Sequence, residues 1–148
     1  MTKDKQPHKF HSLLHAADLL YDYLRTQLAP LEVSPQQARV VMALNRLGEM
    51  SQIDLAREFD IAAASMSTMT ARLIALDLIS SRKDPLNAKR NIVDLTKQGK
   101  ALVDDIDRAW ASVDDHMLEK MGEKDSSQLT ALALSLRDAL GGRRPGGG

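Results

Sequence analysis

The chain has 148 residues with twenty basic and twenty acidic side chains, a length that suits a single domain with flanking helices. It contains no cysteine, which excludes disulfides, thiol-based redox sensing and cysteine-ligated zinc. Its apolar residues never form a run close to the roughly eighteen needed to cross a membrane, so we expect a cytoplasmic protein with no membrane partner.

The charges balance over the whole chain but not within it. Residues 97–140 hold more acidic than basic side chains, whereas residues 80–92 carry several bases and one acid, Asp84. The bases of this segment are Arg82, Lys83, Lys89 and Arg90. A net charge of zero therefore conceals a short basic segment of the kind that binds nucleic-acid phosphates.

Helical periodicity dominates the first third of the chain. Apolar residues recur at steps of three and four over residues 10–28, which predicts a long first helix that ends before Pro30. Ser34 and Gln37 then form a capping-box pattern at the start of a second helix of about three turns.

Two closely spaced helices follow. Ser51 repeats the capping pattern and opens a short helix that ends near Phe59 and Asp60. The next helix begins almost at once, and its spacing predicts a buried stripe on one face and small polar residues on the other. The expected stripe is Met66, Met69, Leu73 and Leu76.

After Asp77 the pattern becomes extended. Residues 78–82 and 91–95 predict two short strands joined by a turn rich in Asp, Pro and Asn, and therefore a β-hairpin. Thr96 is placed to cap the next helix, which is predicted to run to Gly122.

A last helix is predicted to begin at Asp125, with Gln128 completing a capping pattern. The leucines of the first and last helices are too many for a small core to bury, so we expect a second copy of the chain to cover them. These leucines are Leu13, Leu20, Leu24, Leu129, Leu132 and Leu136.

Two short helices followed by a basic hairpin have the order of a winged helix-turn-helix. The predicted fold class is mainly α with a small β-wing, that is α+β. The second short helix has a slim outer face that fits the major groove, about 12 Å wide, and the hairpin can meet the backbone or the minor groove. Each feature alone also fits a solvent-facing surface, and their order favours DNA. The candidate DNA contacts are Ser65, Ser67, Thr68, Arg72, Arg82, Lys83, Lys89 and Arg90.

Several sequence marks follow one another as in a known family. They are Leu55-Ala56, the Ser/Thr-rich stretch 65–72, Leu78-Ile79 with Arg82, Asp84-Pro85, and Val93 to Thr96 with Gly99. With these marks the chain resembles the MarR family of transcriptional regulators over residues 10–140. The resemblance implies a homodimer with interleaved outer helices, two recognition helices in successive major grooves, and a small-molecule pocket between the dimerisation and DNA-binding parts.

The chain departs from the family pattern at several positions. Asn87 and Lys89 stand where the family usually has an Asp–Arg pair that braces the wing, and Arg90 can supply the planar fork instead. Thr68 stands where an arginine is frequent. Asp77 stands where a turn glycine is common, and Asp tolerates that left-handed conformation better than most residues.

These observations divide the chain into parts with separate roles. We expect residues 1–33 and 97–140 to form the dimerisation helices, residues 34–96 the DNA-binding domain, and residues 141–148 a disordered tail. Two-fold symmetry predicts a pseudo-palindromic operator with half-sites about 10 bp apart. We expect a repressor that an aromatic, phenolic or thioester ligand releases from this operator, the ligand class being implied by the resemblance.

Three residues of the expected dimerisation helices are candidates for binding the ligand. His11 and His15 lie four positions apart on the first helix, a spacing that suits a metal, but a solvated or interfacial pair fits better. Trp110 lines either a pocket or the core. We take these three residues as ligand candidates and expect neither a metal nor a cofactor.

The sequence also bears on two other classes of function. An enzyme is not expected, because the sequence has no glycine-rich phosphate loop and no nucleophile with a neighbouring His and Asp. A winged helix used only for protein–protein contact remains the alternative, because a fold does not dictate its function. The basic wing separates the two readings, since an interaction module does not need it to bind phosphates.

Overall fold

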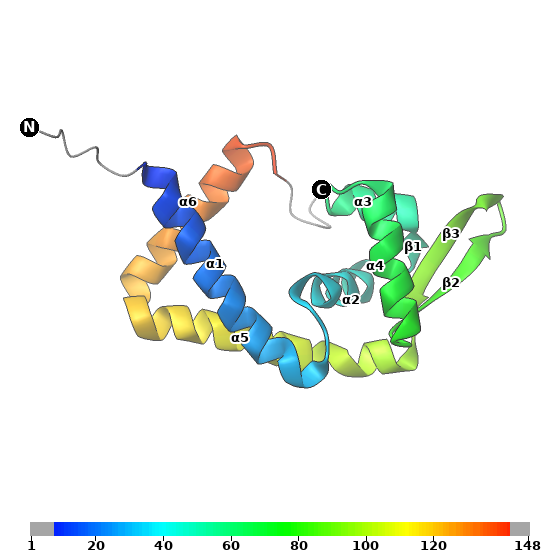
Figure 1. The fold of residues 1–148 in the computed structure, drawn as a ribbon, viewed down its shortest axis with the longest axis horizontal. Coiled ribbons are helices and arrows are strands. Elements are labelled where there is room, and N and C mark those ends of the chain that lie inside the picture. Colours follow the sequence, from blue (N-terminus) through cyan, green and yellow to red (C-terminus); the bar gives the residue numbers. More distant parts are fainter. Residues whose placement is uncertain (1–7, 143–148) are drawn as a thin grey trace, which may run out of the picture.

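The structure is a computed structural model that describes residues 8–142, and Figure 1 shows its helices and strands. The predicted fold class, mainly α with a small β-wing, is confirmed. None of the helices in residues 8–142 has the length and apolar character that crossing a bilayer requires. In chain order the elements are α1 (Lys9–Leu28), the short 3-10 helix η1 (Ala29–Leu31), α2 (Pro35–Leu47), β1 (Met50–Ser51), α3 (Gln52–Glu58), α4 (Ala63–Ala75), β2 (Ile79–Asp84), β3 (Asn87–Leu95), α5 (Lys97–Met121) and α6 (Glu123–Ala139).

Side-chain hydroxyls cap three helices where the sequence predicted them. The Ser34 Oγ accepts the Gln37 N–H at 3.2 Å, and the Gln37 Oε1 accepts the Ser34 N–H at 2.9 Å, which completes the capping box of α2. The Ser51 Oγ accepts the Asp54 N–H at 3.1 Å and so caps α3, and the Thr96 Oγ1 accepts the Gly99 N–H at 3.0 Å and so caps α5. Each cap satisfies a backbone donor that the helix itself leaves without a partner.

The predicted start of the last helix was wrong. α6 begins at Glu123 instead of Asp125, and its N-cap residue is Gly122. Gly122 has a φ of 82°, which lets the chain turn from α5 into α6 at one residue. Asp125 lies inside the first turn, where a carboxylate suits the positive end of the helix dipole. A cap and a first-turn acid look alike in sequence.

The sheet has three antiparallel strands in the order β1-β3-β2. The predicted hairpin is present, with Ser81 opposite Val93 and an irregularity between Lys83 and Asp84. The sequence analysis missed β1, which pairs Met50 with Val93. A strand of two residues is too short to show any alternation.

The predicted buried stripe of α4 was right in part. Met66 and Leu73 are fully buried and Met69 is half-buried, but Leu76 is 43% exposed. Leu76 is the C-cap of α4, where the helix ends. Thr70, which was not part of the predicted stripe, is fully buried. Its hydroxyl donates to the Ser67 carbonyl at 3.1 Å and accepts from the Gln52 amide at 2.8 Å.

The hydrogen bond between Thr70 and Gln52 also joins α4 to α3. It is made in a partly buried place, where a polar pair that satisfies both groups fixes how two helices sit together. The angle of the helix-turn-helix therefore depends on one side-chain pair as well as on apolar packing.

Most of the core lies in the winged helix and at the start of α5. In contrast, α6 has no buried residue, and the three leucines predicted there, Leu129, Leu132 and Leu136, are exposed in the single chain. Figure 1 shows α5 running between the winged helix on one side and the pair α1 and α6 on the other. The largest fully buried side chains are Leu28, Val40, Val41, Leu44, Leu55, Met66, Thr70, Leu73, Ile79, Val93 and Ile106.

The turn after α4 packs against the start of α5. Asp77 takes the left-handed conformation, with a φ of 57°, as the sequence predicted. The Thr96 hydroxyl donates to the Asp77 carbonyl at 2.6 Å, and the Thr96 N–H donates to the Leu78 carbonyl at 3.1 Å. A Cβ on Gly99 would lie 2.1 Å from the Leu78 carbonyl oxygen, so only glycine fits there. This contact fixes the base of the wing relative to α5.

Candidate nucleic-acid interface

The four candidate residues of the recognition helix are exposed on α4. Ser65, Thr68 and Arg72 follow at steps of three and four and therefore share one face, and the exposed Ala64 and Ala71 lie beside Thr68. Ser67 is exposed but lies about 200° around the helix from Ser65, so these two serines stand at opposite edges of the exposed surface of α4. The face is slim, with one long cationic side chain near its C-terminal end.

The groups on this face differ in how they are engaged within the chain. The Thr68 hydroxyl donates to the Ala64 carbonyl at 3.2 Å, so its oxygen can still accept a hydrogen bond from outside the chain. Arg72 forms no ion pair with any residue of the described range 8–142. Its guanidinium is therefore available to an external acceptor.

The two arginines of the wing are held by acids at its base. The Arg82 Nη2 lies 2.8 and 2.9 Å from the two carboxylate oxygens of Glu49, just before β1. The Arg90 Nη2 lies 3.6 Å from the Asp54 Oδ1 and 3.5 Å from the Ser51 Oγ, at the N-terminus of α3. These contacts tie the wing to β1 and α3.

The sheet register explains why both arginines meet the same part of the fold. Ile92 of β3 lies opposite Arg82 on one side and opposite Ser51 on the other. Arg90 is two residues before Ile92 and so shares its face. Both guanidinium groups therefore reach the acids beside β1 and α3.

The two lysines of the wing have a different environment. Lys83 and Lys89 are exposed, and neither has an ion pair within the part of the chain that the structure describes. The Asn87 Oδ1 accepts the Lys89 N–H at 3.1 Å. Asn87 thus braces the loop through the backbone, without the Asp–Arg pair that the family pattern suggests.

The structure does not bring the three ligand candidates together. His11 and His15 are exposed near the start of α1, and the His11 ring centroid lies 4.1 Å from that of Phe10. No three metal-ligating side chains converge among residues 8–142. Trp110 is half-buried on α5 and lines a hollow that contains neither histidine.

The hollow beside Trp110 has a volume of about 290 Å³ and is formed by α2, α5 and the end of α3. The Arg39 guanidinium carbon lies 4.9 Å from the centroid of the Phe59 ring, a cation–π contact at the rim. The sequence analysis missed Arg39 and Phe59, because nothing local links residues from three elements. The lining residues are Arg39, Met42, Ala43, Asn45, Arg46, Phe59 and Trp110.

A larger apolar groove of about 670 Å³ lies between α1, α5 and α6. Leucines of α1 and α6 line it, together with Tyr23 and His116, whose rings stack with centroids 3.9 Å apart. Its lining is almost wholly apolar in the single chain.

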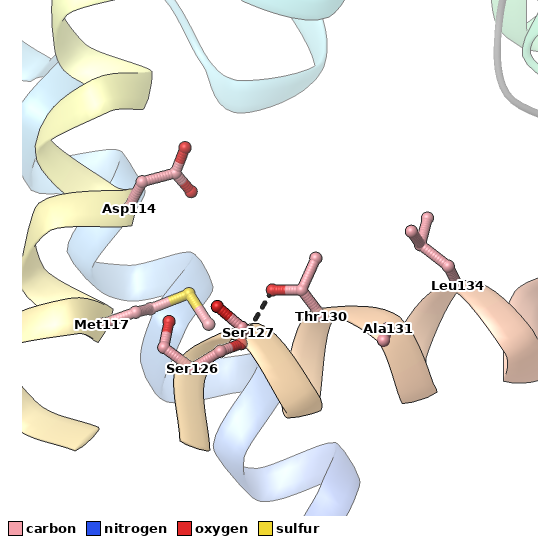
Figure 2. Close-up of a pocket in the computed structure, with 7 residues that line it drawn as sticks. All are labelled: Asp114, Met117, Ser126, Ser127, Thr130, Ala131 and Leu134. Carbon is pink, nitrogen blue, oxygen red and sulfur yellow. Dashed lines mark hydrogen bonds between the residues drawn. The ribbon is translucent and has the colours of Figure 1, made fainter. Parts of the chain in front are cut away.

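Figure 2 shows a second hollow, of about 430 Å³, between α5 and α6. Asp114 and Met117 come from α5, and the hydroxyls of Ser126, Ser127 and Thr130 come from the first turns of α6. The Thr130 hydroxyl donates to the Ser126 carbonyl at 3.0 Å. None of the candidate residues lines this hollow.

The comparisons with known proteins agree with this geometry. The model of the MarR family matches residues 31–90, while no curated protein matches the chain. Among solved structures, the transcriptional regulator PA4135 is 27% identical, with a TM-score of 0.73, and the match covers 90% of this chain and 98% of that one.

Two further structures resemble the chain in fold. Bordetella bronchiseptica BpsR, described with the regulation of its DNA binding by 6-hydroxynicotinic acid, is 20% identical, with a TM-score of 0.79 and coverage of 89% and 94%. The transcriptional repressor CouR, bound to a 23-mer DNA duplex, is 19% identical, with a TM-score of 0.80 and coverage of 86% and 91%. Residues 31–90 thus match the model of the MarR family, and the chain as a whole has the fold of these solved regulators.

Proposed function

We propose that the protein is a homodimeric DNA-binding transcriptional regulator, a repressor that a small aromatic ligand releases from a pseudo-palindromic operator. The observation that carries the proposal is the exposed face of α4 beside a wing whose lysines have no acidic partner in residues 8–142. A slim helix face beside a cationic wing suits the major groove and its flanking phosphates.

The proposal divides the DNA contacts by position. Ser65, Ser67, Thr68 and Arg72 face the major groove, and Lys83 and Lys89 meet phosphates beside it. Arg82 and Arg90 reach a phosphate only by leaving Glu49 and Asp54. We therefore expect a smaller contribution from these arginines than from the lysines.

The outer helices support a homodimer. α6 buries no residue in the single chain, and Leu132 is 60% exposed. The apolar groove between α1, α5 and α6 needs a cover of the same character. We propose that the α1 and α6 helices of a second copy fill it, which makes the interface symmetric.

The hollow beside Trp110 is the proposed effector site. Its floor is apolar and aromatic, and Arg39 at the rim can pair with a carboxylate. An aromatic acid fits this combination, and 6-hydroxynicotinic acid regulates the DNA binding of BpsR. Because α2, α3 and α5 all line the hollow, a ligand there would shift the winged helix relative to the dimerisation helices.

The DNA-binding proposal is tested with duplexes selected from a random pool by the purified protein. We expect Lys83→Ala combined with Lys89→Ala to weaken binding to selected and unrelated duplexes alike. The salt slope, that is the slope of the logarithm of the binding constant against the logarithm of the salt concentration, should fall in magnitude by about two. Fluorescence anisotropy across a salt series measures both quantities.

Lys124→Ala is the matched control, because Lys124 is equally exposed but lies at the start of α6, away from the wing in Figure 1. Failure to select any preferred duplex would contradict the proposal and would favour the interaction module. An unchanged salt slope in the double variant would remove the wing lysines from the interface.

A further inference from the structure

The tip of the wing presents a large apolar side chain to solvent. Leu86 is 96% exposed, more than any other large apolar residue in the range 8–142. Figure 1 shows the β2–β3 hairpin extending beyond the helices, with this turn at its far end. Nothing within the described chain covers the side chain.

The turn that carries Leu86 is braced by side chains on both sides. The Asp84 Oδ1 accepts the Leu86 N–H at 2.9 Å, and the Asn87 Oδ1 accepts the Lys89 N–H at 3.1 Å. Pro85 fixes its own backbone φ. The leucine is therefore held outward by a preorganised loop, so that little conformational entropy is lost when it inserts.

The charges around the tip are arranged to approach a nucleic-acid backbone. Lys83 and Lys89 flank the turn and are exposed. The wing arginines, which would otherwise reach into a narrow minor groove, are held at the base by Glu49 and Asp54. The tip thus combines an apolar apex with flanking cations and no arginine.

We propose that Leu86 is a wedge that enters the minor groove beside each half-site and partly unstacks a flexible pyrimidine–purine step. The inference rests on the proposed DNA-binding function. Apolar side chains inserted between base steps bend the duplex toward the major groove, and pyrimidine–purine steps yield most easily. A single leucine is too small a surface to dock a protein, whereas a groove encloses it from both sides.

The test compares Leu86→Ala, Leu86→Asn and Leu86→Met on a selected duplex. Binding is followed by anisotropy, bending by energy transfer between dyes at the duplex ends, and unstacking by 2-aminopurine placed at each pyrimidine–purine step in turn. We expect Ala and Asn to weaken binding by roughly tenfold and to abolish both the bend and the 2-aminopurine signal. Met keeps the apolar bulk and is expected to retain all three.

The salt slope separates the wedge from the charge contacts. Leu86 variants are expected to keep the wild-type slope, whereas Lys89→Ala lowers it. Because the side chain is exposed, the variants should unfold at the wild-type temperature, which thermal melting checks. If wild-type protein binds selectively and the Ala and Asn variants bind and bend the duplex equally well, the proposed insertion of Leu86 is wrong, while the proposed DNA-binding function is unaffected. If wild-type protein binds no duplex selectively, both are overturned.

Discussion

One backbone contact determines the identity of residue 99. The first turn of α5 lies so close to the Leu78 carbonyl that any side chain would clash with it. The same carbonyl accepts the Thr96 N–H, and the Thr96 hydroxyl bonds Asp77. Residues that the family resemblance marks near the end of the wing therefore act as a joint between the wing and α5.

Gly99→Ala should lower the free energy of unfolding by at least about 2 kcal/mol, because the backbone must shift to relieve the clash. For a chain of this size, a loss of about 2 kcal/mol corresponds to a fall in Tm of roughly 4–8 °C. Thermal unfolding followed by circular dichroism measures it. Lys100→Ala is the control, since its side chain is exposed in the same turn and should change stability by less than about 0.5 kcal/mol. Equal Tm values for Gly99→Ala and wild type would contradict the claim that the contact between residue 99 and the Leu78 carbonyl requires glycine.

Among the helices and strands, the sequence predicted those features that depend on residues close together in the chain. Hydroxyl caps and apolar periodicity placed the starts of α2, α3 and α5, because both signals act within one turn of helix. The left-handed turn at Asp77 was predicted from the family resemblance, together with the tolerance of Asp for that conformation. The exposed face of α4 and the basic wing were also found, since helical spacing and charge are visible in the sequence.

What the sequence could not predict depends on contacts between distant elements. Thr70 is buried because Gln52, eighteen positions earlier, satisfies its hydroxyl. Arg82 and Arg90 looked free to bind DNA, yet Glu49 and Asp54 lie beside them in the fold. No spacing rule connects such pairs.

The proposed effector site is also formed by residues far apart in the sequence, because α2, the end of α3 and α5 each contribute to it. We expect aromatic acids, 6-hydroxynicotinic acid among them, to weaken operator binding several-fold, which needs a coupling of about 1–3 kcal/mol. Arg39→Ala should keep operator binding but lose the response, because the carboxylate loses its partner. Anisotropy titrations measure both.

Arg25→Ala is a suitable control for the effector experiment. Arg25 also lies over an aromatic ring, that of Tyr21, but on α1 and outside the hollow. A response that survives Arg39→Ala, or is lost equally in Arg25→Ala, would place the effector elsewhere.

The long helix α5 connects the winged helix to the outer helices α1 and α6. It begins against the base of the wing and ends against α1 and α6, as Figure 1 shows. In the proposed dimer, two such helices would set the distance between the two copies of α4. The arrangement of the two winged helices is therefore expected to appear directly in the DNA that they protect.

Hydroxyl-radical footprinting of a selected duplex tests directly whether the protein binds DNA as a homodimer through α4 and the wing. A homodimer with one α4 in each of two successive major grooves should protect two half-sites related by two-fold symmetry, with centres about 10 bp or roughly 34 Å apart. The flanking minor grooves should also be protected by the wings. Protection of a single half-site, or of no defined site, would contradict a dimeric regulator that reads DNA with α4 and the wing.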